Sequence, residues 1–364
     1  MPVFENRVAL QLARAIKAFL KVGAGIARDG AAGSVRGPGA SKVSGWNDAQ
    51  ARKLKLAGQR IASKGRMLRT KAGWWLAGER EAGGIRAENI VWIFGAGRTG
   101  STWLAAMMDE LKGQTVWREP LVGALFGNLY YDRAKHLIGK PGKHYILGDG
   151  YRHSWLGSIR AFVLREATGR FPEAAGPGRF LVIKEPNGSF GAPLLMEALP
   201  ESRMVLLVRD PRDVTASSMD ARRTGGWQYE SRKRWRPESP VDKDPDGFVK
   251  IWSTGYLHSI ELAKQAYDAH KGRKVLVRYE ELRADTLGTM RRIYSELGIS
   301  VDEGELRRAV EKHSWESIPE EKKGEGKFYR KATPGSWRED LTPEQAKTVE
   351  EITAPLLNEL YPSS

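Results

Sequence analysis

The sequence predicts an α/β protein built on a parallel sheet with helices on both faces. From residue 89 onward, short apolar segments rich in β-branched residues alternate with segments of helical character, the pattern of strands joined by helical crossovers. Residues 203–208 are apolar almost throughout, as expected for a strand buried on both faces. With 364 residues, of which 41% are hydrophobic and 28% charged, the chain is long enough to bury such a core.

The local pattern places each element in turn. A β-rich run over 89–94 is ended by glycines, and Ser101 then caps a helix that we expect to run to about residue 112. Further short apolar runs predict strands over 114–117, 180–184, 203–208 and 274–278. Helical segments between and after them are expected over 193–199, 212–222 and 282–297. Residues 225–247 are polar, aromatic and proline-rich, which predicts an insertion or lid.

The first 85 residues form a basic extension. They hold 16 Lys and Arg against 5 Asp and Glu, whereas the whole chain holds 59 against 44 and has a formal net charge of +15. The pattern predicts an amphipathic helix over 3–22, a Gly-rich linker over 23–46 and a second basic helix over 48–71. Such helices suit the surface of an anionic membrane, a packed pair on the α/β domain or on a second subunit, or the binding of a polyanionic substrate. The Arg-rich start is also typical of an organellar transit peptide.

Composition excludes several kinds of site. The chain has no cysteine, which excludes disulfides, Cys-ligated metal sites and thiol nucleophiles, and its six histidines leave little material for a metal centre. No apolar run reaches the roughly 18 to 20 residues of a membrane span, and the N-terminus lacks the apolar core of a signal peptide. We expect a cytoplasmic protein, with the membrane surface as a second expectation from its extension.

A phosphate-binding loop is predicted between the first strand and the first helix of the sheet. Small residues there let backbone N–H groups turn inward, and the helix N-terminus adds positive potential. Gly95 and Gly100 have the spacing of a nucleotide triphosphatase loop, but Ser101 stands where that loop carries lysine. The loop is therefore expected to hold a phosphate other than the terminal phosphates of ATP or GTP. The alternative is an ordinary glycine turn capped by Ser101.

A second phosphate site is predicted after the strand at 203–208. Arg209 falls at the carboxyl end of that strand, where open α/β sheets bind ligands, and Ser217 lies on the following helix. Arg209 can grip a phosphate by paired hydrogen bonds while Ser217 donates another. Two phosphate sites on one sheet indicate a nucleotide phosphorylated at two positions.

These motifs resemble those of the sulfotransferases, whose donor is 3′-phosphoadenosine-5′-phosphosulfate (PAPS). Residues 98–103 resemble the family's 5′-phosphosulfate loop, and residues 209–217 its 3′-phosphate motif. Residues 278–282 and 329–338 are similar to two later family segments, in the family's order. The resemblance implies a P-loop-type α/β fold, here as a catalytic domain over 86–364, and favours the bacterial and carbohydrate-type members over the cytosolic aryl type. Ala332 replaces a glycine of the last segment, and Lys184-Glu185-Pro186 replaces a segment that carries the histidine base in cytosolic members.

The resemblance also implies roles for individual residues. Arg98 is expected to act on the oxygen that bridges sulfur and the 5′-phosphate, and Lys184 to point at the transferring sulfonate. Glu119, in a Glu-Pro pair after the second strand, is the expected general base, and Glu185 is the alternative. The remaining expected contacts to PAPS are those to the 5′-phosphate (Thr99, Gly100, Ser101, Thr102), to the 3′-phosphate (Arg209, Ser217, Arg330, Lys331) and to adenine (Trp103, Tyr279, Trp315). No metal is required.

We therefore predict a PAPS-dependent sulfotransferase that acts on an acceptor hydroxyl of a carbohydrate, a glycolipid or another small alcohol by in-line displacement. One alternative is a kinase on the same P-loop scaffold, which Ser101 at the lysine position and the lack of a clear magnesium-binding aspartate weaken. A second is a non-enzymatic basic protein that binds nucleic acid or membrane, which leaves the donor motifs unexplained. We expect no nucleic-acid partner, and the sequence leaves a homodimer open.

Overall fold

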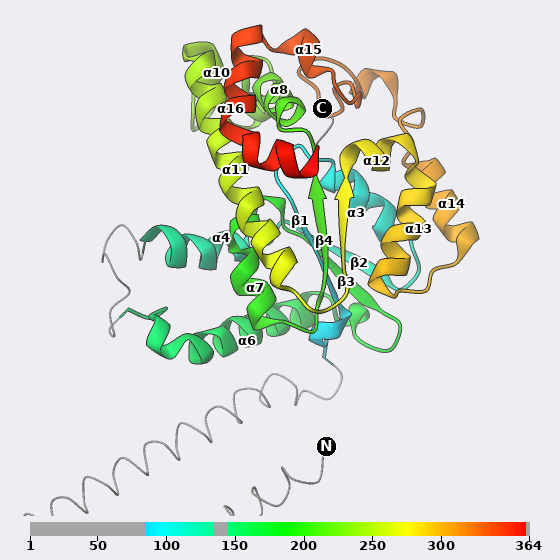
Figure 1. Cartoon of the computed structure of the whole chain (residues 1–364). Coiled ribbons are helices and arrows are strands. Elements are labelled where there is room, and N and C mark those ends of the chain that lie inside the picture. Colours follow the sequence, from blue (N-terminus) through cyan, green and yellow to red (C-terminus); the bar gives the residue numbers. More distant parts are fainter. Residues whose placement is uncertain (1–83, 134–144, 362–364) are drawn as a thin grey trace, which may run out of the picture. The chain divides into compact units, whose positions relative to one another are not determined.

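Five parallel strands form the centre of the computed structural model, which describes residues 84–133 and 145–361 (Figure 1). Their order in the sheet is β2-β3-β1-β4-β5, and every neighbouring pair runs parallel. The strands are β1 (Ile90–Phe94), β2 (Gln114–Arg118), β3 (Phe180–Lys184), β4 (Arg203–Val208) and β5 (Lys274–Arg278). The α/β fold class expected from the sequence is confirmed.

The helices occupy the chain between and after the strands. The α-helices are α3 (Ser101–Asp109), α4 (Val122–Gly127), α6 (Arg152–Arg170), α7 (Ala192–Ala198), α8 (Pro211–Arg222), α9 (Trp227–Arg232), α10 (Pro240–Lys243), α11 (Pro245–Ala269), α12 (Tyr279–Ala284), α13 (Thr286–Leu297), α14 (Glu303–Lys312), α15 (Trp337–Asp340) and α16 (Pro343–Leu360). Short 3-10 and π segments are η1 (Ala87–Asn89), η2 (Asn128–Arg133), η3 (Asp149–Tyr151), η4 (Pro172–Ala174), η5 (Pro186–Gly191) and η6 (Glu320–Lys322).

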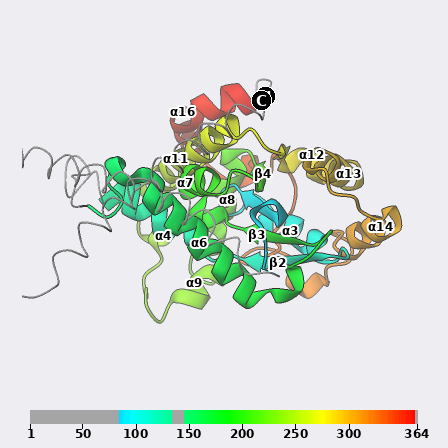
Figure 2. The same ribbon diagram turned by 90° about the horizontal axis from the view of Figure 1, so that it is seen from below.

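The core lies on both faces of the sheet. All five residues of β1 are buried, and they alternate between two hydrophobic clusters because successive side chains of a strand point to opposite faces. Trp92 and Phe94 pack with side chains of α6, α7 and α11, whereas Val91 and Ile93 pack with those of α3 and α13. Figure 2 shows α7 and α11 on one side of the strands and α13 and α14 on the other. Burial on both faces explains why the sequences of these strands are continuously apolar.

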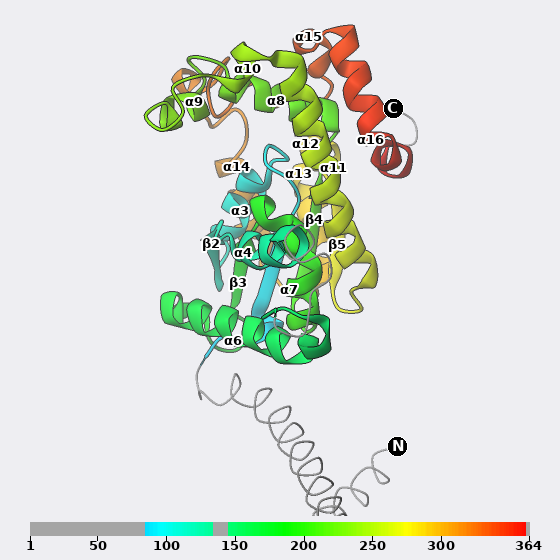
Figure 3. The same ribbon diagram turned by 90° about the vertical axis from the view of Figure 1, so that its left-hand side faces the viewer.

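The carboxyl ends of the strands meet at one edge of the sheet. Figures 1 and 3 show α8 and α15 beyond that edge, with α6 at the opposite, amino-terminal end. Loops that follow parallel strands gather at this edge, so residues far apart in sequence converge there.

The expected elements and the observed ones differ in three respects. The helix expected over 282–297 is confirmed only from Thr286 onward: α12 and α13 are separate, because Asp285 leaves the helical conformation and caps α13 by accepting a hydrogen bond from the Gly288 N–H. The first helix ends at Asp109 rather than near residue 112. The 225–247 insertion contains α9, α10 and the first residues of α11.

The structure also has four helices that the sequence analysis does not predict, α6, α11, α14 and α16. Signals for two of them were present. In α6 the buried residues Trp155, Ile159, Val163 and Ala167 recur at helical spacing. At the start of α16, Thr342 and Gln345 form a reciprocal capping box, with Pro343 between them in the first turn of the helix.

The basic extension falls almost wholly outside the described residues, as do the helices expected over 3–22 and 48–71. The described chain starts at residue 84, and Ile85 is already buried, with its N–H donating to Thr168 Oγ1 at 3.0 Å. Through the described ranges, every helix is too short or too polar to cross a lipid bilayer.

Candidate functional site

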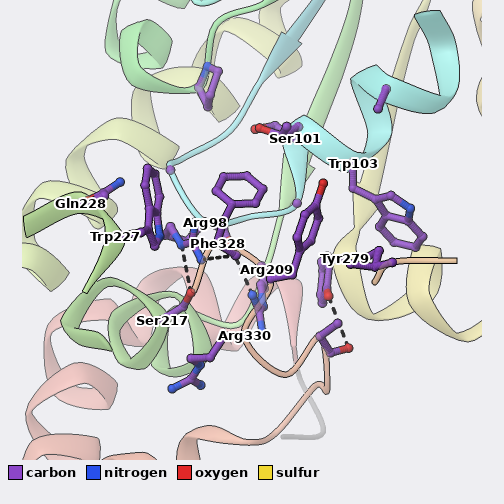
Figure 4. A pocket seen from close by; sticks show the side chains of 18 of the residues that line it. Arg98, Ser101, Trp103, Arg209, Ser217, Trp227, Gln228, Tyr279, Phe328 and Arg330 are labelled. Atoms are coloured by element: carbon purple, nitrogen blue, oxygen red, sulfur yellow. Dashed lines mark hydrogen bonds between the residues drawn. The ribbon is translucent and has the colours of Figure 1, made fainter. Parts of the chain in front are cut away.

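A pocket of 990 Å³ opens at the carboxyl ends of the strands (Figure 4). It is lined by residues that follow each strand and by the C-terminal loop before α15. The predicted site residues on its wall are Arg98, Gly100, Ser101, Thr102, Trp103, Glu119, Arg209, Ser217, Tyr279, Trp315, Arg330 and Lys331. Thr99, Lys184 and Glu185, by contrast, are buried behind it.

The loop between β1 and α3 needs its glycines for close packing. A Cβ on Gly95 would lie 2.4 Å from the carbonyl oxygen of Leu207, so only glycine lets the loop leave β1 so close to β4. Gly100 has a φ of +90°, and a Cβ there would lie 2.6 Å from the Tyr279 ring. Thr99 fixes the turn from inside by donating its hydroxyl to the Ala96 carbonyl at 2.8 Å.

Arg98 projects from this loop into the pocket. Its Nε donates to Ser217 Oγ at 2.9 Å and its Nη2 to the Phe328 carbonyl at 3.2 Å. The guanidinium carbon lies 5.5 Å from the ring centre of Trp227 and 5.4 Å from that of Phe328. Burial, with help from the nearby cations Arg209 and Arg330, lowers the pKa of Arg98 to about 10, so the group stays charged at neutral pH. A charge held out of water in this way interacts strongly with an anion.

Arg209 follows β4 and forms the floor beside Arg98. Its Nη1 donates to the Arg98 carbonyl at 3.1 Å, its Nη2 lies 3.7 Å from Asp213, and its guanidinium lies 4.3 Å over the ring of Tyr279. Within the described residues its Nε has no hydrogen-bond partner. The protein thus leaves hydrogen-bonding capacity of this buried cation unused, as expected beside an anion site.

Arg330 and Lys331 reach the pocket from the loop before α15. Arg330 Nη2 donates to Asp340 at 2.6 Å, and Lys331 Nζ contacts Glu339 at 2.7 Å and Asp340 at 3.0 Å. Asp213 ties the end of this loop to α8, since its carboxylate accepts from the N–H groups of Gly335 and Trp337. The predicted 3′-phosphate residues therefore converge although more than 100 residues separate the two segments.

The backbone around Lys331 is strained at one position. Ala332 has a φ of +53°, in the left-handed region that favours glycine. Its carbonyl accepts from Tyr279 Oη at 3.4 Å and from Arg283 Nε at 3.2 Å, which holds the residue in place. This is the position at which the resembling family carries glycine.

Glu119 and Lys184 form an ion pair at the ends of β2 and β3. The Lys184 Nζ contacts a Glu119 oxygen and also donates to Thr102 Oγ1 at 3.0 Å, while Asn187 donates to the other Glu119 oxygen at 2.8 Å. Lys184 is only 4% exposed, whereas the Glu119 side chain is 37% exposed and faces the pocket. Lys184 therefore orients Glu119 and Thr102 in this structure rather than lining the pocket itself.

Glu185 does not fit the role of alternative base. Its side chain is fully buried and absent from the pocket wall, and it accepts hydrogen bonds from the N–H groups of Leu121, at 3.0 Å, and Gly123, at 3.3 Å. Burial raises the pKa of this carboxyl to about 7. The residue thus holds the first turn of α4, because the N–H groups that start a helix have no partner within it.

An aromatic wall stands on the Tyr279 side of the pocket. Trp103 Nε1 donates to the His313 carbonyl at 2.7 Å, and the rings of Trp103 and Tyr279 lie 6.2 Å apart, edge to face. Trp315 lines the same pocket, with Lys323 5.1 Å from its ring. These flat surfaces suit stacking with a planar base.

Some residues that line or support the pocket are not predicted from the sequence. Phe328 and Asn187 each lie next to a segment that resembles a family motif, but neither residue type by itself indicates a role in binding or catalysis. Asp213 lies inside the motif 209–217 and acts through backbone contacts that sequence does not reveal. Trp227, for which the sequence leaves stacking on a sugar and packing within the lid equally open, lies on the wall of the pocket.

The wall of the pocket is strongly basic. Ten lysine and arginine side chains line it, against one carboxylate, that of Glu119, among its described residues. Such an imbalance favours a ligand with several negative charges. Through the ranges 84–133 and 145–361, no three His, Asp or Glu side chains gather into a group able to hold a metal ion.

Comparison with known proteins gives one family. Residues 91–303 match the Sulfotransferase family. Carbohydrate sulfotransferase 2 of Mus musculus and that of Homo sapiens are each 25% identical to the chain over 210 residues, 50% of this chain and 39% of the relative. The chain thus spans well under half the length of these curated relatives.

Three solved sulfotransferase structures are similar to the chain at low sequence identity. Mouse sulfotransferase SULT7A1 complexed with PAP has 15% identity and a TM-score of 0.44 over 74% of this chain and 85% of that one. Sulfotransferase STF1 from Mycobacterium tuberculosis has 18% identity and a TM-score of 0.41 over 79% and 81%. The sulfotransferase from Alicyclobacillus acidocaldarius has 14% identity and a TM-score of 0.41 over 75% and 96%.

Proposed function

Because this chain belongs to the sulfotransferase family, we propose that it transfers the sulfuryl group of PAPS to an acceptor hydroxyl. The observation that carries the proposal is the meeting of Arg98 and Arg209 in one basic pocket, beside a phosphate loop that has Ser101 in place of lysine. A pocket with two groups of cations suits a nucleotide that carries phosphates at two positions. It suits the single triphosphate chain of ATP poorly.

The donor would be held at three places. The backbone N–H groups and hydroxyls of residues 99–102 would bind the 5′-phosphosulfate at the start of α3. Arg209, Ser217, Arg330 and Lys331 would bind the 3′-phosphate. Trp103 and Trp315 would enclose the adenine, with Tyr279 at its edge.

The transfer would be an in-line displacement at sulfur. The acceptor oxygen forms a bond to sulfur, the bond from sulfur to the 5′-phosphate oxygen breaks, and adenosine 3′,5′-bisphosphate (PAP) leaves. Glu119 would take the acceptor proton, held in place by Lys184 and Asn187. Arg98 would stabilise the negative charge that develops on the leaving phosphate oxygen.

We propose a carbohydrate or another small alcohol as the acceptor. The curated relatives are named carbohydrate sulfotransferases, and the pocket carries the aromatic and polar side chains of Trp227, Gln228 and Ser231 beyond Arg98. Aromatic rings beside polar groups suit a sugar, which has apolar faces and hydroxyl edges.

A nucleotide titration with a transfer assay tests the proposal. Calorimetry should give a lower Kd for PAP than for ATP with Mg²⁺, and radiolabelled PAPS should label acceptors in a glycan and lipid extract. Preference for ATP with Mg²⁺ would instead indicate a kinase on this scaffold. Binding of neither nucleotide would indicate that the basic pocket serves a different anion.

We also propose that the protein works in the cytoplasm at the surface of an anionic membrane. Support comes from the charge of residues 1–85, since each Lys or Arg near such a surface contributes about 1 kcal/mol. Flotation with anionic liposomes at low and high salt, with and without residues 1–45, tests this. Salt-sensitive flotation lost on deletion is the expected result, and failure of the intact chain to float contradicts it.

A further inference from the structure

The pocket extends past the residues assigned to the donor. Beyond Arg98 its wall is formed by Arg222 of α8, by four residues of α9 and by Trp252 of α11. Figure 4 shows Trp227 and Gln228 on one side of Arg98, and Tyr279 and Trp103 on the other. We call this second part, formed by Arg222, Trp227, Gln228, Ser231, Arg232 and Trp252, the acceptor lobe.

Arg222 is a partly buried cation without a counter-ion. Its guanidinium carbon lies 4.0 Å over the ring of Trp252, and its Nη1 donates to the Ser218 carbonyl at 3.3 Å. Within the described residues, no carboxylate comes within ion-pairing distance of it. Burial first, and then the neighbouring cations Arg232 and Arg98, lower the pKa of Arg222 to about 10. Three cations thus surround one lobe and repel one another.

The nearby carboxylates have other partners. Asp220 accepts from the Gly326 N–H, Asp242 from the N–H and hydroxyl of Thr224, and Glu230 pairs with Lys233. The same segment therefore has acidic residues, yet none of them neutralises Arg222 or Arg232. Arg232 is exposed, but Arg222 is partly buried, and a charge out of water is normally paired, so this lobe lacks a negative partner that a ligand can bring.

The acceptor lobe also contains buried polar atoms that form no hydrogen bond with the residues around them. Trp227 Nε1, Trp252 Nε1 and Gln228 Oε1 are buried without a hydrogen-bond partner among the described residues. Unpaired polar atoms are rare in a folded interior and are expected where binding rearranges the side chains.

The donor does not supply the missing charge. Its 3′-phosphate is assigned to Arg209, Arg330 and Lys331, and its 5′-phosphosulfate to the loop after β1. Resting on the proposed function, we infer that the acceptor is itself anionic: a saccharide whose carboxylate or sulfate group is bound by Arg222 and Arg232, with its ring against Trp227 and Trp252. The anionic group would select the acceptor and orient its free hydroxyl toward Glu119.

A matched pair of probes tests this on the full-length chain. With PAP at saturation, calorimetry measures the binding of 4-nitrophenyl β-D-glucuronide and of 4-nitrophenyl β-D-glucoside, which differ at one carboxylate. We expect the glucuronide to bind about tenfold more tightly, the effect of a charge-assisted hydrogen bond. Arg222→Gln with Arg232→Gln should abolish this preference and leave PAP affinity unchanged. Glutamine is the substitution of choice because it retains much of the side-chain stem over Trp252.

The control is Arg223→Gln with Lys233→Gln. These neighbours carry the same charge, pair with Glu325 and Glu230, and do not line the pocket, so the preference should persist. Equal binding of the two probes to the wild-type protein, or binding of neither, overturns the inference. A loss of PAP affinity in the Arg222 and Arg232 variant places these cations in the donor site and also overturns it. Failure of the proposed function is seen separately, as preference of the wild-type protein for ATP over PAP.

Discussion

The side chains of Arg98 and Ser217 meet across the pocket, with 2.9 Å between Nε and Oγ, although 119 residues separate them. Arg98 comes from the loop between β1 and α3, and Ser217 from α8, the helix that follows Arg209. The hydrogen bond therefore joins the two halves of the proposed donor site. It also holds Arg98 between the rings of Trp227 and Phe328, where the charge is shielded from water.

Replacing Arg98 with alanine should lower turnover about 100-fold to 1,000-fold, because the cation acts on charge that develops in the transition state. PAP affinity should fall far less, since the backbone of the loop still binds the 5′-phosphate. Steady-state transfer from PAPS and calorimetry with PAP measure the two effects. Near-normal turnover would remove Arg98 from the catalytic step.

Arg209→Ala should weaken the binding of PAP by about 10-fold to 100-fold, the loss of charge-assisted hydrogen bonds to one phosphate. Adenosine 5′-monophosphate, which lacks the 3′-phosphate, serves as the matched ligand, and its affinity should change much less. If both ligands lose affinity equally, Arg209 shapes the pocket and does not bind the 3′-phosphate.

Glu119→Gln should keep PAP affinity and reduce transfer about 100-fold or more, the usual contribution of a general base. The substitution also removes the ion partner of Lys184, so the unfolding free energy should be measured alongside. Asn187→Ala is the companion variant. It removes a hydrogen bond to Glu119 but no proton acceptor, and should cost much less activity. Full activity of Glu119→Gln would exclude it as the base.

Glu185→Gln should gain stability relative to the wild-type protein as the pH rises from about 5 to about 8. The pKa of this carboxyl is raised from 4.5 to about 7 in the folded state, so between these values the folded chain binds a proton that the unfolded chain has lost. The unfolding free energy of the wild-type protein therefore falls through that window, by up to about 3 kcal/mol from this group. Denaturant unfolding at both pH values measures the difference, and a gain that does not depend on pH would contradict it.

Ala332→Gly should stabilise the protein by up to about 1 kcal/mol, because glycine adopts a φ of +53° without the steric cost that alanine bears. Thermal or denaturant unfolding measures the change. The greater freedom of glycine in the unfolded chain opposes the gain. A clear loss of stability would mean that the methyl group of Ala332 contributes contacts that outweigh the strain.

The sequence by itself determined the sheet and the positions of the loops proposed to bind the donor. Residues 203–208 could be recognised as a buried strand because burial on both faces selects apolar residues along the whole run. Arg98 and Arg209 could be placed at the edge of the sheet because each follows a strand directly, and parallel strands end together. These features depend on residues only a few positions apart in the chain, so the local sequence pattern is enough to predict them.

Only the tertiary structure decided what each charged side chain contacts. Glu119 and Glu185 each precede a proline at the end of a strand, yet one faces the pocket beside Lys184 and the other is buried beneath α4. Arg98 lies beside Phe328, which is 230 residues away in the chain. Such pairings arise from the packing of distant segments, and the electrostatic environment of a charge is set by that packing, because burial removes water and fixes its neighbours.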